Sequence, residues 1–275
     1  MKLDLIQLTA AHPSAKGVAA VRHIHLSVAA GEHVAIIGPS GAGKTTLLHA
    51  MGLAIRPISG ELQHNDANPW ALSRSALQHQ RGQLLLAPQV PPLPPRQRVV
   101  TAVTAALLPQ MGWWDTLASL FYARHAAAAH AALQPFDLGD KLYHRVDRLS
   151  GGERQRVGLA RCVASQASLL LVDEPLSALD PVRSEQALVA LKATAREKAA
   201  TLVVSLHQVH LALAHFPRIV ALRAGELVFD LPSSQVTPEL LNTVYGDQAH
   251  ELNETPLAAF ELPVVAAQPV VMHCR

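Results

Sequence analysis

The chain has 275 residues, and its 23 basic residues nearly balance its 21 acidic ones to give a formal net charge of +2. That length is enough for one large domain with a substantial buried core. The near-neutral charge gives no basic surface for nucleic acid, so we expect no nucleic-acid partner. The two cysteines, Cys162 and Cys274, form no Cys-x-x-Cys pair, which argues against a disulfide framework or a cysteine metal site.

Apolar segments that suit strands alternate with segments that suit helices along most of the chain. The strands are expected at residues 24–28, 33–37, 84–86, 169–172 and 202–206, and the helices at residues 44–51 and 181–198. Two further apolar runs, at 219–222 and 227–229, flank a turn and predict a hairpin. Strands that alternate with helices predict an α/β fold with a mostly parallel sheet.

A proline cluster interrupts this alternation after the third predicted strand. It comprises Pro88, Pro91, Pro92, Pro94 and Pro95. These prolines predict a boundary between two lobes, and the Ala- and Leu-rich stretch 99–133 beyond them favours helices. Polar residues interrupt that stretch before it reaches the ~20 apolar residues of a spanning helix. The first residues also lack the apolar stretch of a signal peptide, so we expect no membrane-spanning segment.

A glycine-rich loop lies between the strand at 33–37 and the helix at 44–51. It reads Gly38, Pro39, Ser40, Gly41, Ala42, Gly43, Lys44, Thr45 and Thr46. Its glycines let backbone N–H groups surround phosphate oxygens, and the helix N-terminus that follows favours negative charge. Lys44 is expected to reach the β- and γ-phosphates of a nucleotide, and the Thr45 hydroxyl to bind Mg²⁺. The alternative is a chance glycine-rich turn, but the strand before the loop and the helix after it favour a nucleoside triphosphate site.

The apolar strand at 169–172 is followed by two acids, Asp173 and Glu174. A carboxylate at a strand end suits a contact to Mg²⁺, so Asp173 is a candidate metal ligand. Because successive residues of a strand face opposite ways, Glu174 points elsewhere and is a candidate general base for an attacking water. The alternative is a pair of solvated acids, which the glycine-rich loop makes the weaker interpretation.

Residues 149–156, Leu-Ser-Gly-Gly-Glu-Arg-Gln-Arg, resemble the signature sequence of ATP-binding-cassette (ABC) proteins. The signature positions are Leu149, Ser150, Gly151, Gly152 and Glu153. In that family the segment faces the γ-phosphate held by a second subunit, so two ATP molecules lie between two chains. A serine N-cap of a helix is the simpler reading of the same residues, and both hold together.

The resemblance implies a P-loop NTPase core of the RecA type, with an N-terminal antiparallel β subdomain and an inserted α-helical subdomain. It predicts one ABC ATPase domain over residues 1–248, with its core at 1–88 and 167–248 and its helical subdomain at about 89–166. The sequence predicts no structure for the tail at 249–275.

Further residues match family positions in the expected order. Gln89 resembles the glutamine that touches Mg²⁺ and the attacking water, and His207 the histidine that contacts the γ-phosphate and orients Glu174. The loop that crosses the dimer interface corresponds to Ser177, Ala178, Leu179 and Asp180. Where the family usually places an aromatic residue to stack on adenine, this chain has His12, which is either a stacking residue or a plain loop residue.

The resemblance implies an ATP- and Mg²⁺-dependent ATPase that acts as a homodimer on transmembrane permease subunits and, through them, with a solute-binding protein. Its location would be peripheral, on the cytoplasmic face of the inner (plasma) membrane. The stretches at 112–117, 205–210 and 240–246 are similar to those of phosphonate importers. Another small solute, an exporter, a non-transport cassette ATPase and a non-hydrolytic nucleotide binder are the alternatives.

The helical subdomain carries aromatic residues that suit a permease contact. They are Trp113, Trp114, Phe121 and Tyr122. Either they form an apolar groove for a cytoplasmic helix of the permease, or they fill the core of the subdomain.

Overall fold

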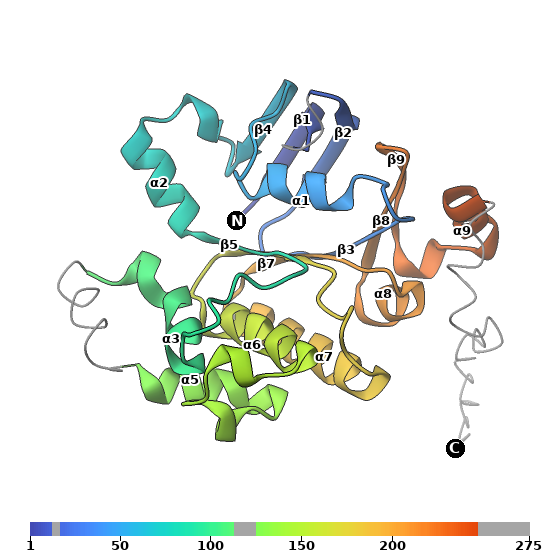
Figure 1. Ribbon diagram of the computed structural model, residues 1–275. Coiled ribbons are helices and arrows are strands. Elements are labelled where there is room, and N and C mark those ends of the chain that lie inside the picture. The colour runs from blue at the N-terminus through green and yellow to red at the C-terminus, as the bar shows by residue number, and fades with distance from the viewer. Residues whose placement is uncertain (13–16, 113–124, 247–275) are drawn as a thin grey trace, which may run out of the picture.

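The computed structural model describes residues 1–12, 17–112 and 125–246 (Figure 1). The four aromatic residues predicted to meet a permease lie outside the described residues, as does the tail from residue 247. Two sheets, with helices between them and beneath the larger one, make up the fold.

The larger sheet has six strands in the order β5-β6-β7-β3-β8-β9. Their bounds are β3 His33–Ile37, β5 Leu84–Ala87, β6 Leu169–Asp173, β7 Thr201–Ser205, β8 Arg218–Arg223 and β9 Glu226–Pro232. All neighbouring pairs are parallel except β8 and β9, which form the predicted antiparallel hairpin. Every residue of β3, β6 and β7 is buried, as expected for parallel strands covered on both faces. The predicted α/β class is confirmed.

The smaller sheet is antiparallel and N-terminal, in the order β2-β1-β4. Its strands are β1 Leu3–Ala11, β2 Ala19–Val28 and β4 Ser59–His64. Helix α1, Lys44–Met51, lies between this sheet and the larger one (Figure 1). The apolar side chains of both sheets and of α1 form one buried cluster, which fixes the glycine-rich loop at the start of α1.

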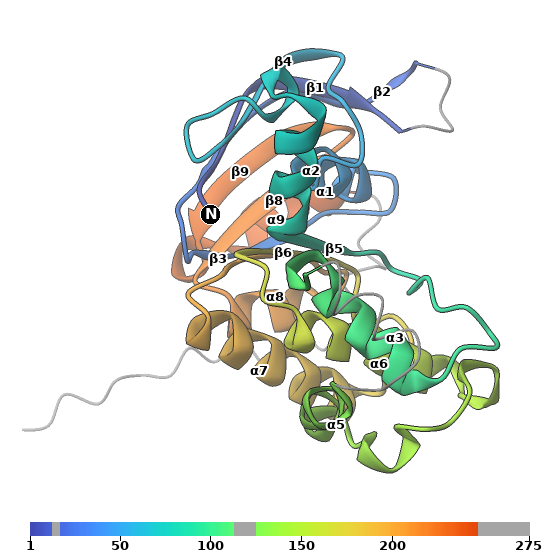
Figure 2. The same ribbon diagram turned by 90° about the vertical axis from the view of Figure 1, so that its left-hand side faces the viewer.

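Helices cover the other face of the larger sheet (Figures 1 and 2). Those that pack on the sheet are α6 Gly151–Ala164, α7 Pro181–Glu197 and α8 Val209–His215. Helices α3 Val99–Thr104 and α5 Ala126–Leu133 pack on α6 and on each other. Helix α2, Arg74–Gly82, leads to β5, and α9, Pro238–Tyr245, lies beside β8. Short 3₁₀ helices occupy Pro69–Ala71, Ala105–Gln110, Gln134–Phe136, Gly139–Lys141, Val146–Arg148 and Ser233–Gln235.

Helix α6 buries one of its faces against the core. Val157, Ala160 and Ala164 are buried, and Val163 packs against the same core from a partly buried position. Within the described part of the chain, none of the helices combines the length and the apolar character that crossing a membrane requires.

Candidate nucleotide site

The glycine-rich loop connects the end of β3 to the start of α1 and cannot tolerate larger residues at two of its glycines. Gly38 has φ 147° and Gly43 has φ 99°, a region that L side chains rarely adopt. A Cβ on Gly38 would lie 2.2 Å from the Leu222 carbonyl oxygen, and one on Gly43 would lie 2.6 Å from the Ala20 carbonyl oxygen. The loop is therefore held close to the neighbouring backbone, with its concave side open.

Lys44 is buried, with 4% of its surface exposed, although it carries a positive charge. Its Nζ donates to the carbonyl oxygens of Gly38 at 2.7 Å and Pro39 at 3.2 Å. The same Nζ lies 3.6 Å from Glu174 Oε1. A buried ammonium group needs such partners, and this one lies in the backbone concavity where phosphate oxygens would bind.

A cavity of about 400 Å³ opens above the loop. It is lined by Ala20, Ser40, Gly41, Ala42, Gly43, Lys44, Thr45, Thr46, Gln89 and Glu174. A buried lysine, a helix N-terminus and a glycine cradle that a Cβ would fill suit a triphosphate, so ATP fits the residues present.

Glu174 is the centre of a polar cluster drawn from four segments of the chain. Gln89 Nε2 donates to its Oε2 at 2.9 Å, while its Oε1 lies 3.6 Å from Lys44 Nζ and 3.9 Å from His207 Nε2. The backbone of Glu174 has φ 41°, which turns the chain sharply after β6. The His207 ring also lies 3.3 Å from Ser40 Oγ of the loop. The structure thus brings together all three residues predicted to be catalytic.

Asp173 is buried and lies behind this cluster. It accepts a hydrogen bond from Ser205 Oγ at 2.6 Å, and the same hydroxyl accepts one from the Glu174 backbone N–H at 2.9 Å. Ser205 therefore fixes both acids, a role that the sequence analysis missed. The sequence shows Ser205 only as the polar last residue of a buried strand, and its partner becomes clear from the strand pairing, which sets it opposite Asp173.

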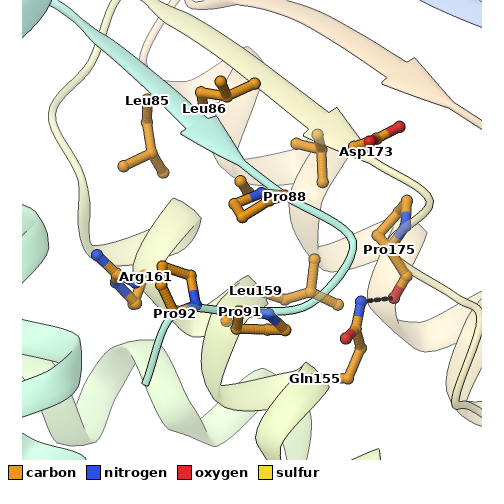
Figure 3. Close-up of a pocket in the computed structure, with 13 residues that line it drawn as sticks. Leu85, Leu86, Pro88, Pro91, Pro92, Gln155, Leu159, Arg161, Asp173 and Pro175 are labelled. Atoms are coloured by element: carbon orange, nitrogen blue, oxygen red, sulfur yellow. Dashed lines mark hydrogen bonds between the residues drawn. The ribbon is translucent and has the colours of Figure 1, made fainter. Parts of the chain in front are cut away.

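The predicted magnesium ligands are divided between two neighbouring spaces. Thr45 and Gln89 line the cavity above the loop, whereas Asp173 lines a smaller pocket of about 50 Å³ below β5 (Figure 3). Mg²⁺ is usually held by one or two protein oxygens together with phosphate oxygens and water. The hydroxyl and amide oxygens of the cavity fit that pattern. Among the described residues no three His, Cys, Asp or Glu side chains are grouped to hold a metal without a nucleotide.

The signature segment forms the first turn of α6 and lies apart from this cavity. Ser150 Oγ accepts from the Glu153 backbone N–H at 3.2 Å, and Glu153 Oε2 accepts from the Ser150 backbone N–H at 2.7 Å, a reciprocal cap. That hydrogen bond from the Ser150 backbone lowers the pKa of Glu153. The described lining of the cavity includes none of the residues 149–153. In a single chain the signature turn is therefore not among the described residues that line the cavity.

Helix α6 is nevertheless tied to the segment that follows Asp173 and Glu174 in its own chain. Gln155 is buried and donates from Nε2 to the Pro175 carbonyl oxygen at 3.1 Å, one residue after Glu174 (Figure 3). A Cβ on Gly152 would lie 2.9 Å from the Ala178 carbonyl oxygen, so the predicted dimer loop packs directly on α6. Movement of α6 would therefore move the segment that carries Glu174.

The predicted dimer loop, Ser177–Asp180, runs between β6 and α7. Asp180 caps α7 by accepting from the Arg183 backbone N–H at 3.0 Å, and this bond lowers the pKa of Asp180. Ser177 and Asp180 are exposed. The segment is thus anchored at Asp180, where α7 begins, and its side chains at Ser177 and Asp180 are accessible to solvent.

His12 stacks on another histidine. Its ring centroid lies 6.2 Å from that of His49 on α1, with 26° between the ring planes. The described lining of the cavity does not include His12. Stacking of His12 on adenine remains a prediction.

Comparison with known proteins places these residues in a family context. Residues 21–177 match the model of the ABC transporter family. The phosphonates import ATP-binding protein PhnC of Polaromonas sp. (strain JS666) is 60% identical over the full length of both chains. PhnC 2 of Albidiferax ferrireducens is also 60% identical over the full length of both, and PhnC 2 of Pseudomonas aeruginosa (strain UCBPP-PA14) is 48% identical over 99% of this chain and 98% of its own.

Solved structures show the same fold. A dimeric post-hydrolysis state of the ATP-binding cassette MJ0796, bound to ADP and Pi, has a TM-score of 0.72 and 26% identity. The match covers 84% of this chain and 98% of that one. CbiO1 of Clostridium perfringens, part of the transporter complex CbiONQ, has a TM-score of 0.70 and 20% identity, over 92% of this chain and 98% of its own.

Proposed function

This chain belongs to the ABC transporter family, and we propose that it is the ATP-hydrolysing subunit of an importer for phosphonate or a related small oxyanion. The observation that carries the hydrolytic part is the convergence of Lys44, Gln89 and His207 on the Glu174 carboxylate. The family's ATP-binding site and the names of its 60% identical relatives support the transport part.

The chain's own residues divide the work of hydrolysis. Lys44 and the backbone of the glycine-rich loop bind the triphosphate, while Glu174 accepts a proton from the attacking water as general base. Gln89 and His207 hold the carboxylate in position from two sides. Ser205 keeps Asp173 and the Glu174 backbone in fixed register at the strand ends.

A magnesium ion fits beside this arrangement. Thr45 and Gln89 would hold it from the cavity and Asp173 from the strand end. When bound, the ion supplies positive charge that neutralises the phosphate oxygens during transfer.

The signature turn of α6 completes the site of a second copy of the chain. In one chain the turn lies outside the cavity, yet its capped helix N-terminus and two glycines suit phosphate oxygens. In a homodimer, each signature turn would cover the glycine-rich loop of the partner, so that turn and loop meet although they lie apart in one chain. The exposed loop Ser177–Asp180 would lie at that interface. The dimeric state of MJ0796 supports this arrangement.

The dimer would act on transmembrane permease subunits as a peripheral component on the cytoplasmic face of the inner membrane. ATP binding shifts the dimer from its open form to its closed form. Helices α3, α5 and α6 of the helical subdomain transmit this movement to the permease. A solute-binding protein would deliver the solute on the opposite side, and no nucleic acid takes part.

A growth experiment tests the transport assignment. The chain is expressed with its permease and binding protein in a bacterium that has no other phosphonate uptake, with methylphosphonate as the sole phosphorus source. Growth is expected with the wild type and absent with Lys44→Ala, whereas both strains grow on inorganic phosphate. Absence of growth on methylphosphonate with the wild type, alongside normal growth on inorganic phosphate, would refute phosphonate import and leave importers of other solutes or exporters as the alternatives.

A further inference from the structure

The last helix of the described chain reaches back to the first glycine of the phosphate loop. The Gly38 backbone N–H donates to the Tyr245 hydroxyl oxygen at 3.1 Å, across 207 residues of sequence. Tyr245 is the last residue of α9 and only 2% of its surface is exposed. A buried hydrogen bond to a backbone amide at such a distance in sequence constrains the loop at its entry.

Gly38 is held at both of its backbone polar groups. Its N–H donates to the Tyr245 hydroxyl oxygen, and its carbonyl oxygen accepts from Lys44 Nζ at 2.7 Å. A residue with a side chain cannot replace Gly38, because a Cβ there would lie 2.2 Å from the Leu222 carbonyl oxygen. Gly38 is therefore the residue where the loop meets both the lysine that binds phosphate and a helix outside the site.

Helix α9 is itself well anchored. Arg223 Nη1 donates to the Thr243 carbonyl oxygen in the last turn of the helix at 2.5 Å. Leu241 and Val244 are buried against the core. A space of about 370 Å³ separates the outer side of the loop from α9, and Tyr245 and Arg223 are among the residues that line it. The Tyr245 hydroxyl is thus a fixed support that contacts the loop at its first residue.

We propose that Tyr245 is a positioning residue for ATP binding. When a triphosphate enters, the Lys44 ammonium group must turn from the Gly38 and Pro39 carbonyls to phosphate oxygens. This movement removes the hydrogen bond to the Gly38 carbonyl oxygen, which is one of the two hydrogen bonds that hold Gly38. Tyr245 keeps the other, so the loop retains its binding shape. Without the hydroxyl, the loop relaxes in the free protein and must be reordered by the nucleotide, which lowers the affinity.

The test is Tyr245→Phe, which keeps the ring and removes only the hydroxyl. Titration calorimetry with ATP is expected to give an affinity about tenfold weaker than that of the wild type, which corresponds to about 1.4 kcal/mol. The KM for ATP rises similarly, while turnover at saturating ATP stays within about twofold, because the hydroxyl acts on binding and not on Glu174. Arg223→Gln, which frees the last turn of α9 but keeps Tyr245, is expected to weaken binding in the same direction.

Two controls separate positioning from general stability. Tyr143→Phe makes the same chemical change at an exposed tyrosine and is expected to bind ATP like the wild type. Val103→Ala lowers stability by at least as much as a lost hydrogen bond, but it lies in α3, which packs on α5 and α6. Wild-type affinity in both Tyr245→Phe and Arg223→Gln, or an equal loss in Val103→Ala, would overturn the proposal. This inference rests on the proposed ATPase function, whose own failure would differ, since the wild type would then not bind ATP.

Discussion

Gln89 and Glu174 lie 85 residues apart in the sequence, yet the Gln89 amide donates to the Glu174 carboxylate at 2.9 Å. The sheet explains this contact, because β5 and β6 are parallel neighbours and Ala87 pairs with Val172. The two segments that follow these strands therefore leave the sheet at the same edge. Since the segment after Gln89 leads to α3, a movement of that helix would reach the proposed general base through one hydrogen bond.

Glu174→Gln is expected to abolish most of the ATP turnover while it leaves ATP binding intact. The amide can still bond to Gln89, but it cannot accept the proton of the attacking water. We expect turnover to fall by about 100-fold or more, with an ATP affinity close to that of the wild type. Phosphate release and titration calorimetry measure the two quantities. The matched control is Glu197→Gln, at an exposed acid on α7, which is expected to change neither. Turnover near the wild-type rate in Glu174→Gln would remove this residue from its role.

Ser205→Ala is expected to lower both stability and turnover. The hydroxyl donates to Asp173 and accepts from the Glu174 N–H, so its loss leaves two buried groups without this partner. We expect the free energy of unfolding to fall by about 1–3 kcal/mol, as measured in urea. Turnover falls as well, because the backbone of Glu174 is no longer held.

Ser184→Ala supplies the matched control for this change. Ser184 is also buried, but among the described residues its hydroxyl oxygen has no hydrogen-bond partner. Its replacement is expected to leave stability unchanged or slightly raised, because a buried hydroxyl without a partner contributes nothing favourable. An equal loss in both variants would contradict the role given to Ser205.

His64 is expected to make the protein less stable in mild acid. Burial at the end of β4 lowers the pKa of His64 from 6.5 to about 4. Between these values the unfolded chain binds the proton and the folded chain does not, so stability is complete above pH 6.5 and is lost as the pH falls towards 4. The contribution is about 1.4 kcal/mol per pH unit within that window.

Urea unfolding of the wild type and of His64→Leu at several pH values measures this contribution. The variant is expected to lose less stability between pH 6.5 and pH 4, because it has no imidazole at position 64 for the unfolded chain to protonate in that range. His25→Leu, which replaces an exposed histidine of β2, is expected to keep the wild-type dependence. If His64→Leu and the wild type lost stability in parallel, the buried imidazole would not be the cause.

The larger sheet could be predicted from sequence because its strands are short apolar runs that end at polar residues. The N-terminal antiparallel sheet was predicted from the family resemblance and is confirmed, but the residue pattern located only a portion of β2 and neither β1 nor β4. In β1 the alternation breaks at Gln7, which has φ 53°, and the pairing shifts register there. In β4, Gly60 breaks the apolar pattern, and it allows a close approach to the Gln7 carbonyl. These two irregularities interrupt the alternating pattern that indicates a strand, so β1 and β4 could not be predicted from the sequence pattern.

Of the site, the groups proposed to contact a nucleotide could be named from the sequence, and the groups that hold them could not. Lys44 and Glu174 stand in motifs whose spacing follows from the chemistry of phosphate and water. Ser205, Gln155 and Tyr245 act through contacts to residues that are distant in sequence, and nothing in their local sequence indicates those partners. Their roles follow from strand order and from the position of α9, which only the folded chain reveals.

The most direct test of the two-chain reaction centre mixes two inactive variants. Lys44→Ala removes the lysine proposed to bind the triphosphate, and Ser150→Arg places a bulky side chain in the signature turn. Each homodimer is therefore expected to be inactive. A mixed dimer has one site built from the intact loop of one chain and the intact signature turn of the other. Equal mixing is therefore expected to restore about a quarter of the wild-type ATP turnover. If the mixture stayed as inactive as its two components, each chain would have to hold its complete site alone, and the account would be contradicted.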